Sequence, residues 1–315
     1  MTRRSRKLQK PKALRKGSRI GIVSPSSPAE PTSIAAGIAE LTRLGFVVEE
    51  PAEMKPEGYF AGSGKQRIDQ FCRIVHNKGI DGVIASRGGY GANYLIDFDF
   101  ATRLQGPKCV IGFSDVNILQ ILLTEVRQWA GFYGPMVAAG FDKGAQQAGG
   151  YDENSFLQAV GETKRKWEIS LRGSAMKTGA ASGHLVGGCL TMLQTTIGTG
   201  WEPDTEGAIL LLEDRGMKPY QVDRAMRHLL QAGKLAKVAG IVLGDFPDCY
   251  PPVPGSPSVA EICAEVLGPL RVPIVYGAPI GHTKRPMLTV PLGVGAKLHA
   301  RNEGTLEILE PAVVE

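Results

Sequence analysis

The chain has 315 residues, a length that favours two domains because a single hydrophobic core stops growing near about 250–300 residues. Hydrophobic residues make up 43% and charged residues 21%, a globular composition that excludes a disordered or fibrous chain. No apolar run approaches the roughly 20 residues of a membrane helix, and the basic N-terminus lacks the apolar segment of a secretory signal. We therefore expect a cytoplasmic protein without a membrane partner.

The formal net charge of +5 is unevenly distributed. Residues 1–16 hold eight cationic side chains and no acidic one, so the remaining chain carries a net negative charge. We expect a solvated basic tail at 1–16; an anchor for nucleic acid or anionic membranes is the alternative. No aromatic residue interrupts the tail for base stacking, so we expect no nucleic-acid partner.

The first half alternates short apolar runs with segments of helical spacing. The predicted strands are 19–24, 46–49, 82–86 and 109–113, and the predicted helices are 33–44, 66–78 and 116–126. This alternation predicts a parallel sheet flanked by helices, in a flavodoxin-like N-terminal domain at 17–145. Functional sites of such sheets lie at the carboxyl ends of the strands.

The alternation of strand and helix patterns stops at 146–182. This stretch is polar and rich in glycine, and we interpret it as a linker or an inter-domain excursion. A second α/β domain, rich in strands, is expected at 183–315. Its predicted strands are 208–212, 239–243, 273–276, 288–292, 296–300 and 305–309, with a helix at 220–232. The five cysteines are odd in number and lack C-x-x-C spacing, which indicates a reducing compartment and no metal site.

Ser114 is the candidate nucleophile. An apolar strand runs directly into this serine and a helix begins within two residues, as in a nucleophile elbow. The amide groups at such a helix start can stabilise an oxyanion. The G-x-S-x-G pattern is incomplete, and serine or aspartate is also the usual helix cap, so a purely local role stays open.

A serine nucleophile needs a base and an orienting acid. His282 follows a predicted strand and a turn rich in glycine and proline, where an imidazole is readily exposed; His184 is its rival. Glu213 is the first acid after the apolar strand at 208–212. The alternatives are that His282 is a loop histidine without a function and that Glu213 caps the start of a helix. Taken together, Ser114, Glu213 and His282 predict a serine hydrolase.

The loop S-R-G-G-Y-G at 86–91 follows a predicted strand. The backbone amides at its glycines are accessible to an anion. They can act either as donors to an oxyanion or as a binding loop for phosphate. It lacks the Lys-Ser/Thr of a P-loop and does not match G-x-G-x-x-G, so nucleotide binding is weakly supported. A tight packing turn is the alternative.

Several of these motifs resemble the LD-carboxypeptidases of peptidase family S66, which include muramoyltetrapeptide carboxypeptidases and microcin C immunity peptidases. The resemblance covers about 11–309 and rests on eight motifs in order: GSRIGIVSPSSP at 17–28, SRGGYG at 86–91, IGFSD at 111–115, GPM at 134–136, GHLVGG at 183–188, LLLED at 210–214, GDF at 244–246 and APIGH at 278–282.

This resemblance implies a two-domain α/β peptidase with Ser114 as nucleophile, His282 as base and Glu213 as its orienter. It also implies an oxyanion hole, most plausibly formed by the amides of Asp115 and Gly89. No metal or other cofactor is expected, and the family normally forms homodimers. Two positions depart from the family pattern, Tyr133 in place of histidine and Cys189 in place of asparagine, and we expect both to affect substrate fit rather than the triad.

We expect the chain to release the terminal D-Ala from murein tetrapeptides in cell-wall recycling. The alternatives are an immunity peptidase acting on an acyl-adenylate analogue and a non-catalytic anion-binding protein. A carboxypeptidase must recognise a free carboxylate, for which a guanidinium suits best. Arg87, at the start of the glycine loop, is our candidate, with Lys284 and Arg285 as rivals; all three could instead be solvated surface charges.

Overall fold

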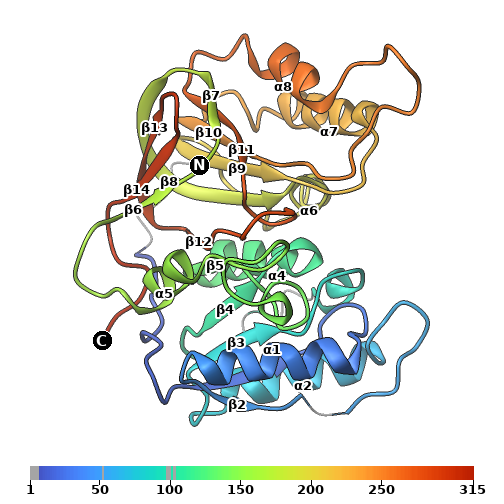
Figure 1. Ribbon diagram of the computed structural model, residues 1–315, viewed down its shortest axis with the longest axis vertical. Helices are drawn as coiled ribbons and strands as arrows, with labels where there is room; N and C mark the ends of the chain where they lie inside the picture. The colour runs from blue at the N-terminus through green and yellow to red at the C-terminus, as the bar shows by residue number, and fades with distance from the viewer. Residues whose placement is uncertain (1–6, 52, 97–100, 102–103) are drawn as a thin grey trace.

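The computed structural model describes residues 7–51, 53–96, 101 and 104–315. Two β-sheets, each with its own helices, form an upper and a lower lobe in Figure 1, and the chain passes between them more than once. This two-domain α/β architecture confirms the predicted fold class.

The first sheet has the strand order β12–β5–β4–β3–β1–β2. Strands β1 to β5 pair in parallel, and β12 pairs antiparallel with β5. The central strands are almost wholly buried, as expected where both faces of a parallel sheet are covered. The bounds are β1 (Arg19–Val23), β2 (Val47–Glu49), β3 (Gly82–Ala85), β4 (Cys109–Gly112), β5 (Gly131–Tyr133) and β12 (Val290–Leu292).

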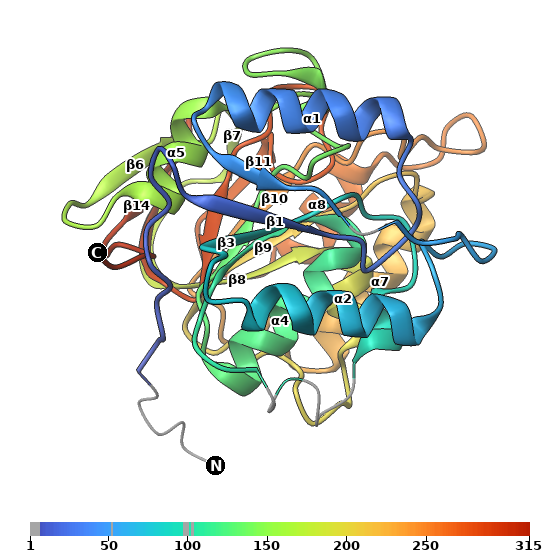
Figure 2. The same cartoon turned by 90° about the horizontal axis from the view of Figure 1, so that it is seen from below.

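Helix α1 (Pro31–Arg43) covers one face of this sheet, and α2 (Gly64–His76) and α4 (Asn117–Leu122) cover the other (Figure 2). Proline starts α1, and Ser63 and Gln66 form a capping box at the start of α2. The helix predicted at 116–126 is thus α4 followed by a π-helical turn, η3 (Leu123–Arg127). Short 3-10 turns are η1 (Ala92–Leu95), η2 (Ser114–Val116) and η4 (Phe141–Lys143).

The second sheet has the order β6–β14–β13–β8–β9–β10–β11–β7. Strands β8 to β11 are parallel and the flanking strands antiparallel. Its strands are β6 (Trp167–Ser170), β7 (Ser174–Lys177), β8 (Gly179–Cys189), β9 (Ala208–Glu213), β10 (Gly240–Gly244), β11 (Ile274–Ala278), β13 (Gly295–Ala300) and β14 (Thr305–Ile308). Its helices are α6 (Leu190–Thr195), α7 (Pro219–Gln231) and α8 (Val259–Leu267).

The segment 146–182 is not the predicted linker. It forms helix α5 (Glu153–Gly161) and then β6 and β7, which are the two edge strands of the second sheet. Edge strands tolerate polar residues and need no continuous apolar run, so their sequence resembles a loop.

The predicted tail at 1–16 is also corrected, as far as it is described. Leu14 is buried, and its amide donates to the carbonyl of Val160 at 2.8 Å. Lys10 pairs with Glu310, with 2.6 Å between Nζ and Oε2. Residues 7–16 therefore pack on the folded body, whereas the remainder of the predicted tail lies outside the described residues.

The third correction concerns β12, which the sequence places in the second domain. Val290 pairs with Tyr133 and Leu292 with Gly131, so this strand completes the first sheet. Residues 290–292 therefore belong to the first sheet, although the chain on both sides of them belongs to the second domain.

Within the described ranges, no helix combines the length and apolar character required to cross a bilayer.

Helix α1 is pressed against the segment that leads to η4. A Cβ added at Gly37 would lie 2.1 Å from the carbonyl oxygen of Val137, so this helix position has no room for a side chain.

We expect Gly37→Ala to lower the free energy of unfolding by about 1–3 kcal/mol through overpacking, although alanine normally favours a helix. Gly64→Ala is the matched control, because a Cβ at this first residue of α2 meets nothing within 4 Å. Urea denaturation of both variants measures the difference. A Gly37→Ala protein as stable as the control would contradict the close approach.

Candidate active site

Strand β4 delivers Ser114 to the carboxyl edge of the first sheet with a left-handed backbone. Its φ is 62°, a region that non-glycine residues seldom occupy, so the backbone is strained at this serine. The residues that precede η2 and α4 are Phe113 and Val116, and neither supplies a side-chain cap. A capping role therefore does not account for Ser114.

The glycine loop lies directly against this serine. A Cβ at Gly88 would be 2.9 Å from Cβ and 3.1 Å from Oγ of Ser114. Gly89 has a φ of 112°, and a Cβ there would lie 2.4 Å from Oγ of Ser27. The same Ser27 hydroxyl accepts a hydrogen bond from the amide of Tyr90 at 3.1 Å. Glycine is thus required by the close approach of two loops around Ser114.

A buried polar network supports these loops from below. The carboxylate of Asp115 accepts hydrogen bonds from the hydroxyl of Ser26 at 2.6 Å and from the amide of Ala92 at 2.7 Å. Burial raises the pKa of Asp115, and these two hydrogen bonds act in the opposite direction. The Arg67 guanidinium is buried as well and donates to the carbonyl of Gly91 at 2.7 Å. Nothing in the local sequence pattern indicated Arg67.

Glu213 and His282 meet at the carboxyl edge of the second sheet. Glu213 is the last residue of β9 and has no exposed surface, whereas the His282 side chain is 16% exposed. Nδ1 of His282 lies 2.9 Å from Oε2 of Glu213, and the His282 amide donates to the same oxygen at 2.8 Å. The predicted acid and base are thus in contact. This arrangement leaves Nε2 of the ring for another partner.

Glycine makes room for this pair. A Cβ at Gly281, whose φ is 59°, would lie 2.5 Å from the carboxylate carbon of Glu213. A Cβ at Gly244 would lie 2.5 Å from Cβ of Glu213. The ring of Phe113, the neighbour of Ser114, packs edge-on against His282 with 5.1 Å between ring centroids. His282 is therefore held between Glu213 and Phe113, the residue that precedes Ser114.

The electrostatic surroundings of His282 favour its charged form. Burial lowers the pKa of the imidazole, but the charge and hydrogen bonds of Glu213, with a contribution from Asp214, outweigh it and raise the pKa above 6.5. Arg215 acts in the opposite direction.

Tyr133 and Cys189 do not have the positions that we expected. The phenol of Tyr133 is fully buried and donates to Oε1 of Glu213. The Cys189 thiol is buried 3.6 Å from Oδ2 of Asp214, and burial, followed by that carboxylate, raises its pKa well above the usual value. Neither side chain lines the cavity beside His282. The expectation of a direct effect on substrate fit is therefore not supported.

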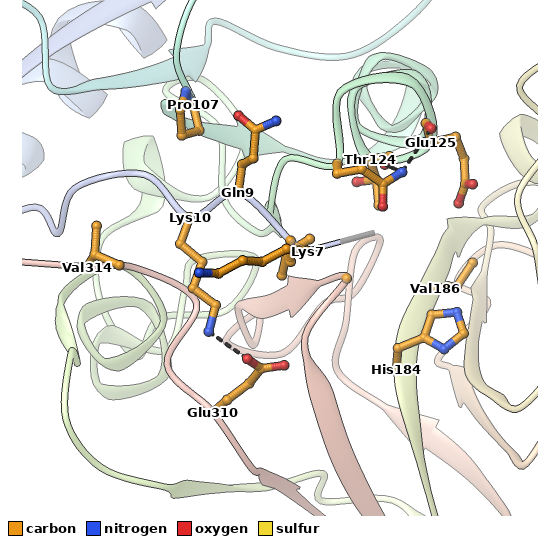
Figure 3. Close-up of a pocket in the computed structure, with 13 residues that line it drawn as sticks. Lys7, Gln9, Lys10, Pro107, Thr124, Glu125, His184, Val186, Glu310 and Val314 are labelled. Atoms are coloured by element: carbon orange, nitrogen blue, oxygen red, sulfur yellow. Dashed lines mark hydrogen bonds and ion pairs between the residues drawn. The ribbon is translucent and has the colours of Figure 1, made fainter. Parts of the chain in front are cut away.

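The rival base His184 lies elsewhere. It pairs with Ala208 at the amino end of β9, five residues before Glu213, which places it about 16 Å away along the strand. It lines a separate cavity of about 860 Å³ with Lys10 and Glu310 (Figure 3). His282 is thus the histidine associated with the predicted acid.

A cavity of about 370 Å³ opens beside His282 and is rich in charged side chains. Three of its cations pair with neighbouring carboxylates: Lys143 with Asp142, and Arg215 and Lys284 with Asp248. The guanidinium of Arg87 donates only to the carbonyl of Pro28, at 3.2 Å, among the contacts of the described residues. Across the described ranges, no three His, Cys, Asp or Glu side chains are grouped to hold a metal ion.

Comparison with known proteins identifies two family models. Residues 20–134 match the LD-carboxypeptidase N-terminal domain, and residues 182–298 match the LD-carboxypeptidase C-terminal domain.

Individual relatives match over most of their length. A probable murein peptide carboxypeptidase of Bacillus subtilis is 31% identical over 97% of this chain and 96% of its own. The microcin C7 self-immunity protein of Escherichia coli is 28% identical over 88% of this chain and 89% of its own. The crystal structure of a muramoyltetrapeptide carboxypeptidase from Oxalobacter formigenes has a TM-score of 0.81, at 28% identity, over 93% of this chain and 99% of its own.

The contact between Glu213 and His282 predicts a measurable titration. We expect the imidazole of His282 to titrate above pH 6.5 in an NMR experiment, because the carboxylate stabilises the imidazolium. Glu213→Gln should lower this pKa, since the neutral amide removes that charge while burial remains. The His299 signal, from strand β13, is the internal control. An unchanged His282 titration in Glu213→Gln would contradict the pairing.

Proposed function

The chain belongs to the LD-carboxypeptidase family, and on this premise we propose that it is a serine-type L,D-carboxypeptidase that releases the terminal D-Ala from murein tetrapeptides. Its products would be a tripeptide and D-Ala, which suits the recycling of cell-wall peptides. The proposal includes the homodimer and the cytoplasmic location expected from the sequence.

One observation carries the proposal: Glu213 and His282 form a buried pair, and His282 packs against Phe113, which directly precedes the strained Ser114. In the proposed reaction, Nε2 of His282 removes the proton from Oγ of Ser114 as Oγ attacks the carbonyl carbon before D-Ala. Glu213 keeps the ring in the tautomer with hydrogen on Nδ1 and stabilises the imidazolium. The close approach of Ser114 and His282 is itself part of the proposal.

The remaining steps follow from proton balance. The imidazolium gives its proton to the amine of D-Ala as the C–N bond breaks, leaving an acyl ester on Ser114. His282 then removes a proton from water, which attacks the ester, and returns it to Oγ. We assign the oxyanion hole to the backbone amides of Asp115 and Gly89, because both residues lie at loops that enclose Ser114.

A second candidate within the family is an immunity-type peptidase that acts on an aminoacyl-adenylate analogue. The similarity to the microcin C7 self-immunity protein over 88% of the chain favours testing it. In this reading the same three residues would act on a different leaving group. A non-catalytic anion-binding protein is the alternative outside enzymes.

Ser114→Ala should reduce hydrolysis at least about a thousandfold while leaving substrate binding intact. Ser33→Ala is the matched control, since Ser33 lines the same cavity and has no role in the proposed chemistry. Release of D-Ala from a murein tetrapeptide and cleavage of an aminoacyl sulfamoyl adenylate are measured side by side. Undiminished hydrolysis by Ser114→Ala, or cleavage of the adenylate analogue alone, would overturn the proposal.

We propose that Arg87 binds the free carboxylate of the substrate. Among the cations that line the cavity within the described residues, Arg87 is the one without a carboxylate partner, which leaves its guanidinium available. Its place at the start of the glycine loop would put a bound carboxylate near Ser114. The rival Arg285 is bonded to Asp245 and to the carbonyl of Gly277, and Lys284 to Asp248.

Arg87→Gln should reduce kcat/KM at least about tenfold for a free tetrapeptide and far less for its C-terminal amide. Lys284→Gln removes a cation of the same cavity that already has a partner, so it should affect both substrates little. Steady-state kinetics on the acid and the amide provide the comparison. Equal losses on both substrates for Arg87→Gln would show that this residue supports the loop instead.

A further inference from the structure

Glu213 has a third hydrogen-bond donor besides the two groups of His282. Tyr133, the last residue of β5, reaches across from the first sheet and donates its phenolic hydrogen to Oε1 of Glu213. Oε2 is taken by the amide and Nδ1 of His282, at 2.8 and 2.9 Å. The carboxylate is therefore held from both sheets at once.

The surroundings of Tyr133 fix its ring and keep its proton in place. The ring packs edge-on against Phe113 at 6.4 Å, and a Cβ at Gly188 would lie 2.6 Å from its Cε2. Burial, and then the charge of Glu213, raise the pKa of the phenol well above 10, while a hydrogen bond from the backbone of Ser114 acts in the opposite direction. These surroundings favour the protonated phenol, which is the form that donates to Glu213.

Donation to a buried carboxylate has two physical effects. It fixes the rotation of the carboxylate, and so the direction from which His282 is held. It also withdraws part of the negative charge that the imidazole experiences, because a hydrogen bond to the ionised form stabilises that form. Without this donor, the pair of Glu213 and His282 would bind a proton more tightly.

We propose that Tyr133 is a positioning residue of the reaction: its hydroxyl orients Glu213 and limits the basicity of the Glu213–His282 pair. This inference rests on the proposed function and adds a residue outside the triad. It also links the two halves of the site, because the same phenol donates to the carboxylate of Glu213 while its ring packs against Phe113, the neighbour of Ser114.

Other titratable groups face the same pair. Asp214 raises and Arg215 lowers the pKa of His282 from the loop after β9, and the thiol of Cys189 lies near Asp214 on β8. A change at Tyr133 leaves these groups in place. A shift in titration can therefore be assigned to the phenolic hydroxyl.

Tyr133→Phe removes the hydroxyl and keeps the ring. We expect kcat to fall about tenfold or more with little change in KM, and the acidic limb of the kcat/KM profile to move upward by about one pH unit. The pKa of His282 in NMR should rise in parallel. Tyr151→Phe is the matched control, because Tyr151 is buried and donates to Glu40 at 2.7 Å in the core beneath α1.

A Tyr133→Phe protein whose pH profile and His282 titration are unchanged would overturn the inference, whatever its stability. If this variant fails to fold, 3-fluorotyrosine at position 133 keeps the hydroxyl and makes it a stronger donor. The acidic limb of the kcat/KM profile should then move to lower pH. A shift to higher pH, or no shift, would contradict the role of Tyr133. The NMR titration needs no substrate. Undiminished hydrolysis by Ser114→Ala would contradict the proposed function, whereas an unchanged titration in Tyr133→Phe would contradict only this inference. The two failures are therefore distinguishable.

Discussion

A carboxylate without exposed surface needs hydrogen-bond donors in place of water, and Glu213 is such a group. Its donors come from two directions: the Tyr133 phenol ends a strand of the first sheet, and His282 follows a strand of the second. Glycines at 281 and 244 let the backbone close around it. Glu213 is thus a point at which hydrogen bonds join the two sheets.

Ser114 depends on a different constraint. A left-handed serine persists only where the surrounding structure holds it, and here the glycine loop and the segment before α1 interlock around Ser114. The guanidinium of Arg67 and the carboxylate of Asp115 bond to backbone on both sides of that junction. The strain is therefore local, and its support is polar and buried.

Much of this site was predictable because an apolar run that ends in a polar residue marks the carboxyl end of a strand. Ser114 and Glu213 follow this rule, and the turn before His282 is equally plain. Tyr133 was noticed only as a departure from the family pattern, because β5 is too short for periodicity and its partner lies 80 residues away. The edge strands at 167–177 were missed because their polar sequence resembles a loop.

The return of residues 290–292 to the first sheet affects how the protein is made. Translation proceeds from the N-terminus, so β1 to β5 leave the ribosome long before β12 exists. Until then β5 is an open edge, with unpaired backbone groups that can recruit another chain. Tyr133 lies on that strand and pairs with Val290. The nascent N-terminal half therefore has an incomplete sheet, and Tyr133 lacks its strand partner, until residues 290–292 have been synthesised.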